Sequence, residues 1–541
     1  MGLHQVLVGL FSVIVIFLGY WLSKGRKNDI LSRLRGPTPT SLLLGNYVQY
    51  FKDEVGTHEF QWQERYGNAY RIKGLFGEDQ LLISDPKALQ HVYQTSGTDY
   101  VRTRVRREFG RLIAGKGIVW ARGDDHRRHR KILGPAFSAV ETRGMIPVFI
   151  KTAQKLCDNW KSRIAKEGHS TGRVEISGEV SRAALDAIGE AAFNYDFQSL
   201  DNKPNGLAEA FRNLSDNSFS LPSPKAIFAQ HALNYVPVSA LRFLTSLPSR
   251  SLAGLQRVDA EGYRVSREVL NERLEEIKSE NGDEKEDILS LLIKANTSAS
   301  EKTKLSQEEL MAQIRTVILA GFETVGSTVS FLLYEVARRP DVQSRVREEV
   351  NAHLQGRSDD SLDASDLDSL PYTSAVIKEA MRIHPVVYGP ILEVLKDDII
   401  PLSKPVIDRY GVPHAEIPIA KGSLILTSFA GYNRLTDVWG PDAHDFKPER
   451  WLEDAEWKVS RPFGIYSGLG NFASGGVSCL GWRFAVYEIH TYLIQIIRRF
   501  ELSYPQDLPP IIRAAGGVMA PVVRGHEEKG KRLMLEMKIL N

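Results

Sequence analysis

The stretch FASGGVSCLGWRFAVYEIHTYLIQIIRRF, residues 472–500, decides the fold of this chain. It places Cys479 among Gly475, Gly476 and Gly481, directly before an amphipathic segment that predicts a helix. Glycines let the backbone approach a flat ligand closely, and the free N–H groups at a helix N-terminus stabilise a thiolate. The alternative is a structural cysteine buried in a turn, the ordinary interpretation of a lone cysteine among glycines. The rest of the chain has to decide between the two.

Two further segments carry charges at informative positions. KEAMRIHP, residues 378–385, places Glu379 and Arg382 one helical turn apart, ahead of a proline that ends the helix. FKPERW, residues 446–451, adds Arg450 behind a proline. Taken alone, the first spacing is typical of a surface ion pair of little energetic value.

A long helix is predicted from residue 306 to about residue 340, N-terminal to these charged segments. Ser306 and Glu309 form a capping box, and the helical pattern that follows runs for about 33 residues, long enough to cross a globular protein. Gly321 interrupts its apolar run just before Glu323 and Thr324. Because glycine inside a helix costs about 1 kcal/mol, a packing or ligand contact is expected there. Without a cofactor, Glu323 would face solvent and Thr324 would bond back to its own helix.

Composition indicates one large globular unit. The chain has 541 residues, 43% of them hydrophobic, and a formal net charge of +3. This charge is too small to indicate a nucleic-acid-binding protein. Residues 101–131 carry a local charge of +8, but without the stacking aromatics of a single-strand binder. The two cysteines indicate a reducing compartment, and Cys157 is expected to pack on a helix face as a small hydrophobe. Strand-like pieces are short, near residues 81 and 417, so the predicted class is mainly α with a minor β component.

The N-terminus predicts a membrane anchor. Residues 6–22 carry no charge, and a helix of this length can cross a bilayer core of about 30 Å. Lys and Arg residues follow the apolar run and none precedes it, which leaves the bulk of the chain in the cytosol. A cleaved signal peptide is the alternative, but it needs a basic segment before the apolar run and a small-residue cleavage site after it, and this sequence has neither. We therefore expect an anchor at 1–23, a basic, proline-containing hinge at 24–45 and one catalytic domain at 46–541.

Together these motifs resemble those of the cytochrome P450 superfamily, and their residues are similar to those of its fungal microsomal members. The pattern Phe472-x-x-Gly475-x-x-x-Cys479-x-Gly481 resembles the family's cysteine-ligand loop, and residues 320–324 resemble its distal-helix motif. The resemblance implies that Cys479 is the axial ligand of the haem iron and that Glu323 and Thr324 relay protons during oxygen activation. It further implies a structural charge network of Glu379, Arg382 and Arg450. The implied cofactor-binding residues are Cys479, His126, Arg130, Phe472, Gly475, Gly481, Ala320 and Gly321.

The resemblance also implies an activity and its partners. The expected fold holds haem b between the long distal helix and the helix after Cys479. The expected reaction is monooxygenation, the insertion of one oxygen atom from O2 into a lipophilic substrate, in secondary metabolism or xenobiotic oxidation. Electrons would come from NADPH through NADPH–cytochrome P450 reductase, with cytochrome b5 as an optional donor, at the endoplasmic reticulum membrane. No nucleic-acid partner is expected. A family isomerase or dehydratase, and a non-enzymatic haem protein, are the competing functions.

Two positions depart from the family pattern. The cysteine loop usually carries an arginine where this chain has Val477, and the segment after the Glu-x-x-Arg helix usually carries one where it has Leu392. Both arginines normally bind haem propionates. Our hypothesis is that His126 and Arg130 do so here, helped by Arg122 or Trp120. The alternative is a paralogue that holds haem poorly or has lost activity.

Overall fold

The computed structural model describes residues 29–540, apart from 167, 204, 208, 211–221, 248–251, 279–286, 301, 358–360 and 453–462. The predicted anchor at 1–23 and the first residues of the predicted hinge lie outside the described residues. Helix α2 (Asp29–Arg33) ends ahead of Pro37, and the Arg35 carbonyl after it accepts a hydrogen bond of 3.0 Å from the N–H of Arg71. The described part of the hinge is therefore tied to the body of the protein.

Helices make up most of the described chain, which confirms the mainly α class. Four of them form the centre of the molecule: α10 (Ile176–Phe193), α16 (Gln307–Ala337), α19 (Pro371–Ile383) and α22 (Trp482–Arg499). The other helices are α3 (Tyr47–Lys52), α4 (Thr57–Tyr66), α5 (Pro86–Gln90), α6 (Arg104–Ala114), α7 (Gly123–Leu133), α8 (Ala139–Gly144), α9 (Ile146–Lys166), α12 (Pro224–Ala232), α13 (Val238–Ser246), α14 (Ala253–Lys278), α15 (Ile288–Thr297), α17 (Pro340–His353), α18 (Ala364–Asp368), α20 (Phe429–Tyr432) and α21 (Thr436–Trp439).

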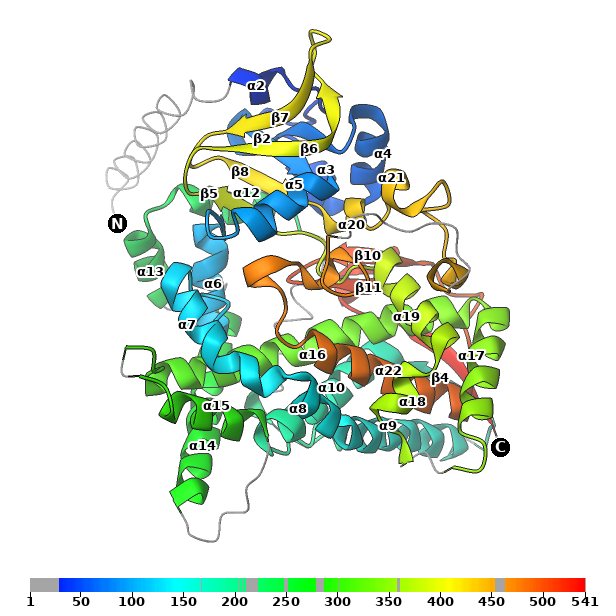
Figure 1. Ribbon diagram of the computed structural model, residues 1–541. Helices are drawn as coiled ribbons and strands as arrows, with labels where there is room; N and C mark the ends of the chain where they lie inside the picture. The colour runs from blue at the N-terminus through cyan, green and yellow to red at the C-terminus, as the bar shows by residue number, and fades with distance from the viewer. Residues whose placement is uncertain are drawn as a thin grey trace, which may run out of the picture.

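The strands form four small sheets among the described residues, and the largest has the order β1-β2-β8-β5-β3. Its only parallel pair is β2 with β8; the other neighbours are antiparallel. In Figure 1 this sheet and the β6–β7 hairpin occupy one end of the molecule together with α3, α4 and α5, and the longer helices α9, α10, α14, α16 and α22 occupy the other. The strands are β1 (Ala69–Lys73), β2 (Asp79–Ile83), β3 (Tyr100–Arg102), β4 (Thr171–Glu175), β5 (Ile391–Val394), β6 (Asp398–Ile407), β7 (Pro413–Ile419), β8 (Leu424–Thr427), β9 (Phe500–Ser503), β10 (Ile511–Ala515), β11 (Met519–Val523) and β12 (Met534–Ile539).

The predicted strand positions near residues 81 and 417 are confirmed, since β2 covers the first and β7 and β8 cover the second. The turn at Lys421 and Gly422 separates β7 from β8, but these two strands do not pair with each other. Strand β7 pairs with β6, whereas β8 enters the five-stranded sheet between β2 and β5.

Helix α16 crosses the middle of the molecule, as its predicted length requires (Figure 1). The capping box is present: Ser306 Oγ accepts from the N–H of Glu309 at 3.2 Å, and Glu309 Oε2 accepts from the N–H of Ser306 at 2.9 Å. Within the described residues α16 is the one helix long and apolar enough to span a membrane, but 67% of its most apolar window is buried. It is therefore the core helix of this fold.

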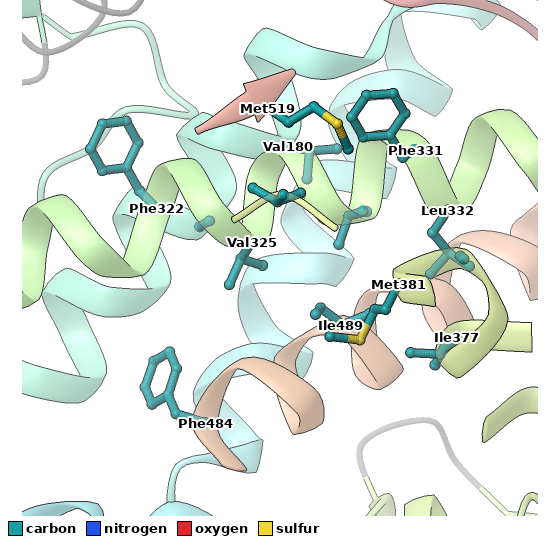
Figure 2. Close-up of a cluster of buried hydrophobic side chains, with 14 of the residues drawn as sticks. Val180, Phe322, Val325, Phe331, Leu332, Ile377, Met381, Phe484, Ile489 and Met519 are labelled. Carbon is teal, nitrogen blue, oxygen red and sulfur yellow. The ribbon is translucent and has the colours of Figure 1, made fainter. Parts of the chain in front are cut away.

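The core is built where α16 meets its neighbours. Figure 2 shows Val180 from α10, Phe322 and Phe331 from α16, Met381 from α19 and Ile489 from α22 converging on one cluster, and each is at most 4% exposed. Cys157 of α9 is fully buried beside α22, where its thiol lies 3.7 Å from the carbonyl oxygen of Gln495. The prediction that Cys157 packs as a small hydrophobe is confirmed.

Candidate active site

The cysteine loop connects a tight turn at Gly475–Val477 to helix α22, so Cys479 lies just ahead of a helix N-terminus. The N–H of Cys479 donates to the carbonyl of Phe472 at 2.9 Å and closes the loop. Burial raises the pKa of the Cys479 thiol, while the N–H of Gly481 and the charge of Arg130 act to lower it. The side chain still keeps accessible surface. Cys479 lines a groove of about 470 Å³ together with Arg130, Phe137 and Trp482.

Gly475 allows the loop to sit directly on the segment at 91–95. Its φ is +63°, and a Cβ at this position would lie 2.1 Å from the carbonyl oxygen of Tyr93. Next to it, the Gln94 side-chain amide donates to Ser474 Oγ at 2.7 Å. Only glycine fits this conformation and this approach without strain. The predicted need for glycine next to the cysteine therefore has a packing reason on this side of the loop.

Glu379, Arg382 and Arg450 lie in contact. Arg382 donates two hydrogen bonds of 2.8 Å to the Glu379 carboxylate, and Arg450 Nε donates to the same carboxylate at 3.3 Å. The side chains are 0, 0 and 2% exposed, respectively. The two guanidinium groups also donate to main-chain carbonyl groups, those of Asn433, Trp439, Asp442, Ala443 and Asp445. This is a buried, highly connected group of charges and not a surface ion pair.

Two asparagines that the sequence did not single out link these charges to the cysteine loop. Arg382 donates to the Asn433 carbonyl at 2.9 Å, and the Asn433 side chain accepts from the N–H of Gly470 at 3.0 Å. Asn433 also donates to the Asn471 side chain at 2.8 Å, which in turn donates to the carbonyl of Met381 at 2.9 Å. A chain of hydrogen bonds thus runs from helix α19 to the start of the loop. No local sequence pattern marks it, because its members meet only in the folded protein.

The distal-helix motif has two different environments. At Gly321 an added Cβ would lie 2.7 Å from Ile188 Cγ1, so this glycine allows α10 to pack closely on α16. Thr324 Oγ1 donates to the carbonyl of Ala320 at 2.7 Å, the back-bonded arrangement considered in the absence of a cofactor. Ala320 itself is exposed. Glu323, in contrast, does not face solvent.

Glu323 is held in a buried ion pair with Lys531. Lys531 Nζ lies 3.1 Å from Glu323 Oε2, with side-chain exposures of 5 and 11%. The same ammonium donates to Ser181 Oγ on α10 at 2.7 Å. Lys531 is 208 residues away along the chain. Sequence reasoning missed this partner, and only the need of a buried carboxylate for a cation pointed to it.

His126 and Arg130 lie one turn apart on α7, and Arg130 reaches the cysteine loop. Its guanidinium donates to the carbonyl of Ser478 at 2.6 Å and to Ser478 Oγ at 2.9 Å. Burial lowers the pKa of His126, and the nearby charge of Arg130 acts in the same direction. Helix α7 is tied to the start of α16 by an ion pair between Arg128 and Glu309 at 2.5 Å. The structure therefore brings α7, α16 and the cysteine loop together.

The two positions that depart from the family pattern offer no donor to an anion. Val477 is 43% exposed, and Leu392 is 5% exposed within β5. Even so, the residues present fit an iron porphyrin with two carboxylates. Cys479 lines a groove with Arg130, and His126 lies one turn from Arg130 on α7. Trp120 Nε1 is buried with no hydrogen-bond partner in the described part of the chain. An unpaired buried N–H is a group that a bound anion would satisfy.

Comparison with known proteins identifies the family. The cytochrome P450 family model matches residues 34–525. Cytochrome P450 monooxygenase 205 of Postia placenta is 32% identical over 523 residues, covering 94% of this chain and 93% of the relative. Cytochrome P450 monooxygenase claU of Ampulloclitocybe clavipes is 31% identical over 503 residues, covering 91% of each chain. Both relatives are fungal, and the match spans nearly the whole chain. The chain belongs to the cytochrome P450 family and is a haem-dependent monooxygenase.

Proposed function

We propose that this enzyme inserts one oxygen atom from O2 into a lipophilic substrate, with Cys479 as the thiolate ligand of its haem iron and NADPH as the electron source through a membrane-bound reductase. The observation that carries the proposal is the position of Cys479. It lines a groove at the start of α22, beside Arg130, where the N–H of Gly481 favours the thiolate. Haem with a thiolate ligand supplies the O–O bond cleavage on which monooxygenation depends.

The cysteine loop would hold the thiolate in a fixed geometry. Asn433 and Asn471 tie the loop to the buried charges of α19, and Gly475 seats it on the carbonyl of Tyr93. Hydrogen bonds to the sulfur would stabilise the thiolate against protonation. We assign Glu379, Arg382 and Arg450 to this supporting role and to no chemical step.

Thr324 and Glu323 would manage protons on the distal side. The Thr324 hydroxyl, which donates to Ala320, can turn to pass its proton elsewhere because a hydroxyl both donates and accepts. Glu323, held by Lys531 in a buried ion pair, would exchange protons with Thr324 when that ion pair opens. Proton transfer by positioned groups of this kind is worth about 10²–10⁴-fold in rate.

His126 and Arg130 would bind the haem propionates, with Trp120 Nε1 or Arg122 as further donors. Arg130 already lies at the cysteine loop through Ser478. The test is haem titration of His126→Ala and Arg130→Ala proteins, each of which should bind haem more weakly. Unchanged haem occupancy in both variants would contradict this assignment.

A basic groove beside Cys479 supports the reductase as electron donor. Its volume is about 470 Å³, and its lining includes Arg130 and Arg483 and no acidic residue. An acidic donor domain would be attracted to such a surface near the thiolate. Exposed apolar side chains on α13, with Phe243 at 63%, and at Leu42, at 95%, support contact with the endoplasmic reticulum membrane and delivery of lipophilic substrates from it. Secondary metabolism or xenobiotic oxidation would use such substrates.

The first experiment is the ferrous–carbon monoxide difference spectrum of the purified full-length protein. The wild type should show the band that names the family, and Cys479→Ala should lose it. Cys157→Ala is the matched control, because this second cysteine is fully buried and burial raises its pKa to about 12. A histidine-type band in the wild type would overturn the proposed ligation.

NADPH consumption distinguishes the monooxygenase from the alternative functions. With reductase present, a monooxygenase consumes NADPH in step with oxygenated product, whereas a family isomerase or dehydratase converts its substrate without NADPH. A haem carrier does neither. Resistance of the protein to alkaline extraction from microsomes, lost on deletion of residues 1–23, would test the proposed single-pass anchor.

A further inference from the structure

A cavity of about 270 Å³ lies between α4, β6 and the segment that contains α21 (Figure 1). None of its lining residues belongs to the cysteine loop, α7 or α16. Val406, Arg434 and Leu435 form its buried part, and Arg434 is 9% exposed. The cavity is much larger than the roughly 30 Å³ that one water molecule occupies, so it can admit a small organic molecule.

The guanidinium of Arg434 has no carboxylate partner among the described residues. Its Nη2 donates to the carbonyl of Ile383 at 2.8 Å, and its central carbon lies 5.0 Å from the centre of the Phe60 ring. In the part of the chain that the structure describes, Nε and Nη1 have no hydrogen-bond partner, and both keep accessible surface. Since the side chain is otherwise buried and lines the cavity, these N–H groups are available to a ligand there.

The carboxylates near Arg434 already have other partners. The charges of Glu335 and Glu54 act on Arg434, but Glu335 pairs with Arg339 and Glu54 pairs with Arg513 at 2.8 Å. Burial lowers the pKa of Arg434, and the charge of Arg513 acts in the same direction. These five side chains carry three positive and two negative charges, so the group lacks one anion. Buried charges without a counter-ion are rare because desolvation is costly.

The rim of the cavity is polar and exposed. Lys404 and Asp437 pair with each other at 2.8 Å, so their charges offset. His444 lies edge-on to Phe60 at 5.1 Å and has no hydrogen-bond partner among the described residues. Glu64 is exposed, and its carboxylate would repel an anion. The rim thus leaves room for a charged ligand and contains one group that opposes it.

We propose that this cavity binds a small organic anion, with its phosphate or carboxylate group on Arg434 and its apolar part against Phe60, Val406 and Leu435. A guanidinium presents its N–H groups in a planar fork that fits either anionic group. The stacked Phe60 ring and the two aliphatic side chains favour an organic anion over a bare inorganic one. The inference is independent of the haem, since no lining residue belongs to the site around Cys479.

Arg434 connects this cavity to the support of the cysteine loop. Its guanidinium donates to Ile383, the residue after Arg382, and Asn433, which precedes it, accepts from the N–H of Gly470 at 3.0 Å. An anion on Arg434 would therefore hold together segments that carry the loop. Because such a ligand binds only the folded protein, it should also stabilise the enzyme in proportion to its concentration.

The test is calorimetric titration of the purified full-length holoprotein at constant ionic strength, with inorganic phosphate, phenyl phosphate and benzoate as probes. Phenyl phosphate or benzoate should bind saturably, more tightly than inorganic phosphate, and should raise the melting temperature. The tighter of these two probes identifies the anionic group that the site prefers.

Three variants locate the site. Arg434→Gln should abolish saturable binding. Because Arg434 also bonds to Ile383, its replacement can affect folding, and Thr436→Glu tests the site with Arg434 in place. Thr436 is an exposed lining residue, so a carboxylate there should weaken binding of the tighter probe about 10-fold. Glu64→Gln removes the repelling carboxylate and should strengthen binding about 3-fold.

Two controls make the result specific. Glu416→Gln removes an exposed carboxylate of β7 outside the cavity and should leave the affinity unchanged. The ferrous–carbon monoxide spectrum should stay as in the wild type in Thr436→Glu and Glu64→Gln, which separates this inference from the proposed function. The inference is overturned if the wild type binds none of the three probes saturably. Equal affinities in the wild type, Thr436→Glu and Glu64→Gln would overturn it as well.

Discussion

Two buried ionic groups lie near the active site, and they differ in how they are connected. On the cysteine side, the Glu379 carboxylate accepts from Arg382, Arg450, the Trp451 indole and the N–H of Lys447. On the distal side, Glu323 is paired with Lys531. The first group is fully enclosed, whereas Glu323 keeps 11% of its side chain exposed.

The difference teaches what each group does. A carboxylate with four donors has no freedom to change its orientation, which suits a support for the cysteine loop. A carboxylate held by one flexible ammonium can exchange partners, which suits a group that takes up and releases protons. The two groups also differ in how far apart their partners lie in the sequence. Glu379 and Arg382 are three residues apart, whereas Glu323 and Lys531 are 208 residues apart.

The largest effect is expected from breaking the first group. Arg382→Leu strands the buried charge of Glu379 and should lower the free energy of unfolding by about 3–5 kcal/mol. Urea unfolding of the holoprotein measures this loss. The matched control is Arg264→Leu, which removes the same i, i+3 glutamate–arginine spacing from the surface of α14, where Arg264 is 55% exposed. It should cost less than about 0.5 kcal/mol, and equal losses in both variants would contradict the distinction.

The next effect compares one glycine on each side of the site. Gly475→Ala forces a positive φ on alanine and sets its Cβ against the Tyr93 carbonyl, so we expect a loss of about 3 kcal/mol. Gly321→Ala meets the Ile188 side chain, which can move, and gains helix propensity, so its cost should stay below about 1 kcal/mol. Thermal unfolding of both variants checks the order, and a larger loss at Gly321 would reverse our account.

Lys531→Met should cost about 2 kcal/mol, less than Arg382→Leu, because Glu323 can relieve its lost partner by taking up a proton. Adding Glu323→Gln should recover most of this loss, which gives a coupling free energy of at least about 1 kcal/mol in the double-mutant cycle. Additive losses would mean that the two side chains do not interact. Lys531→Arg should behave like the wild type in the same unfolding measurement.

The smallest effect concerns Glu309, which joins the N-terminus of α16 to α7. Burial opposes its ionisation, but hydrogen bonds from Arg128, Ser306 and His129 outweigh burial and lower its pKa from 4.5 to about 2. Its stabilising contribution is therefore complete above about pH 4.5 and is lost as the pH falls toward 2. Glu309→Gln should be less stable than the wild type by about 1 kcal/mol at pH 7, and the gap should narrow at pH 4 and again at pH 3. A gap that stays constant with pH would assign the effect to packing.

Local patterns in the sequence determined much of this protein. The capping box and the apolar period that follows determined where α16 begins and that it runs through the core. The glycines around Cys479 determined a tight loop ahead of α22, and the three-residue spacing brought Glu379 and Arg382 together. Each of these features depends on residues within about one or two helical turns, so chain geometry alone brings them into contact.

Only the tertiary structure decided the partners that come from distant parts of the chain. Lys531 reaches Glu323 because the segment before β12 passes α16, and Asn433 reaches the cysteine loop because α20 packs beside it. Arg434 lines a cavity because α4 and β6 pack beside it, which no composition or period of the sequence specifies. The physical reason is that such contacts depend on how whole elements are packed in a dense interior, which local chain geometry does not determine.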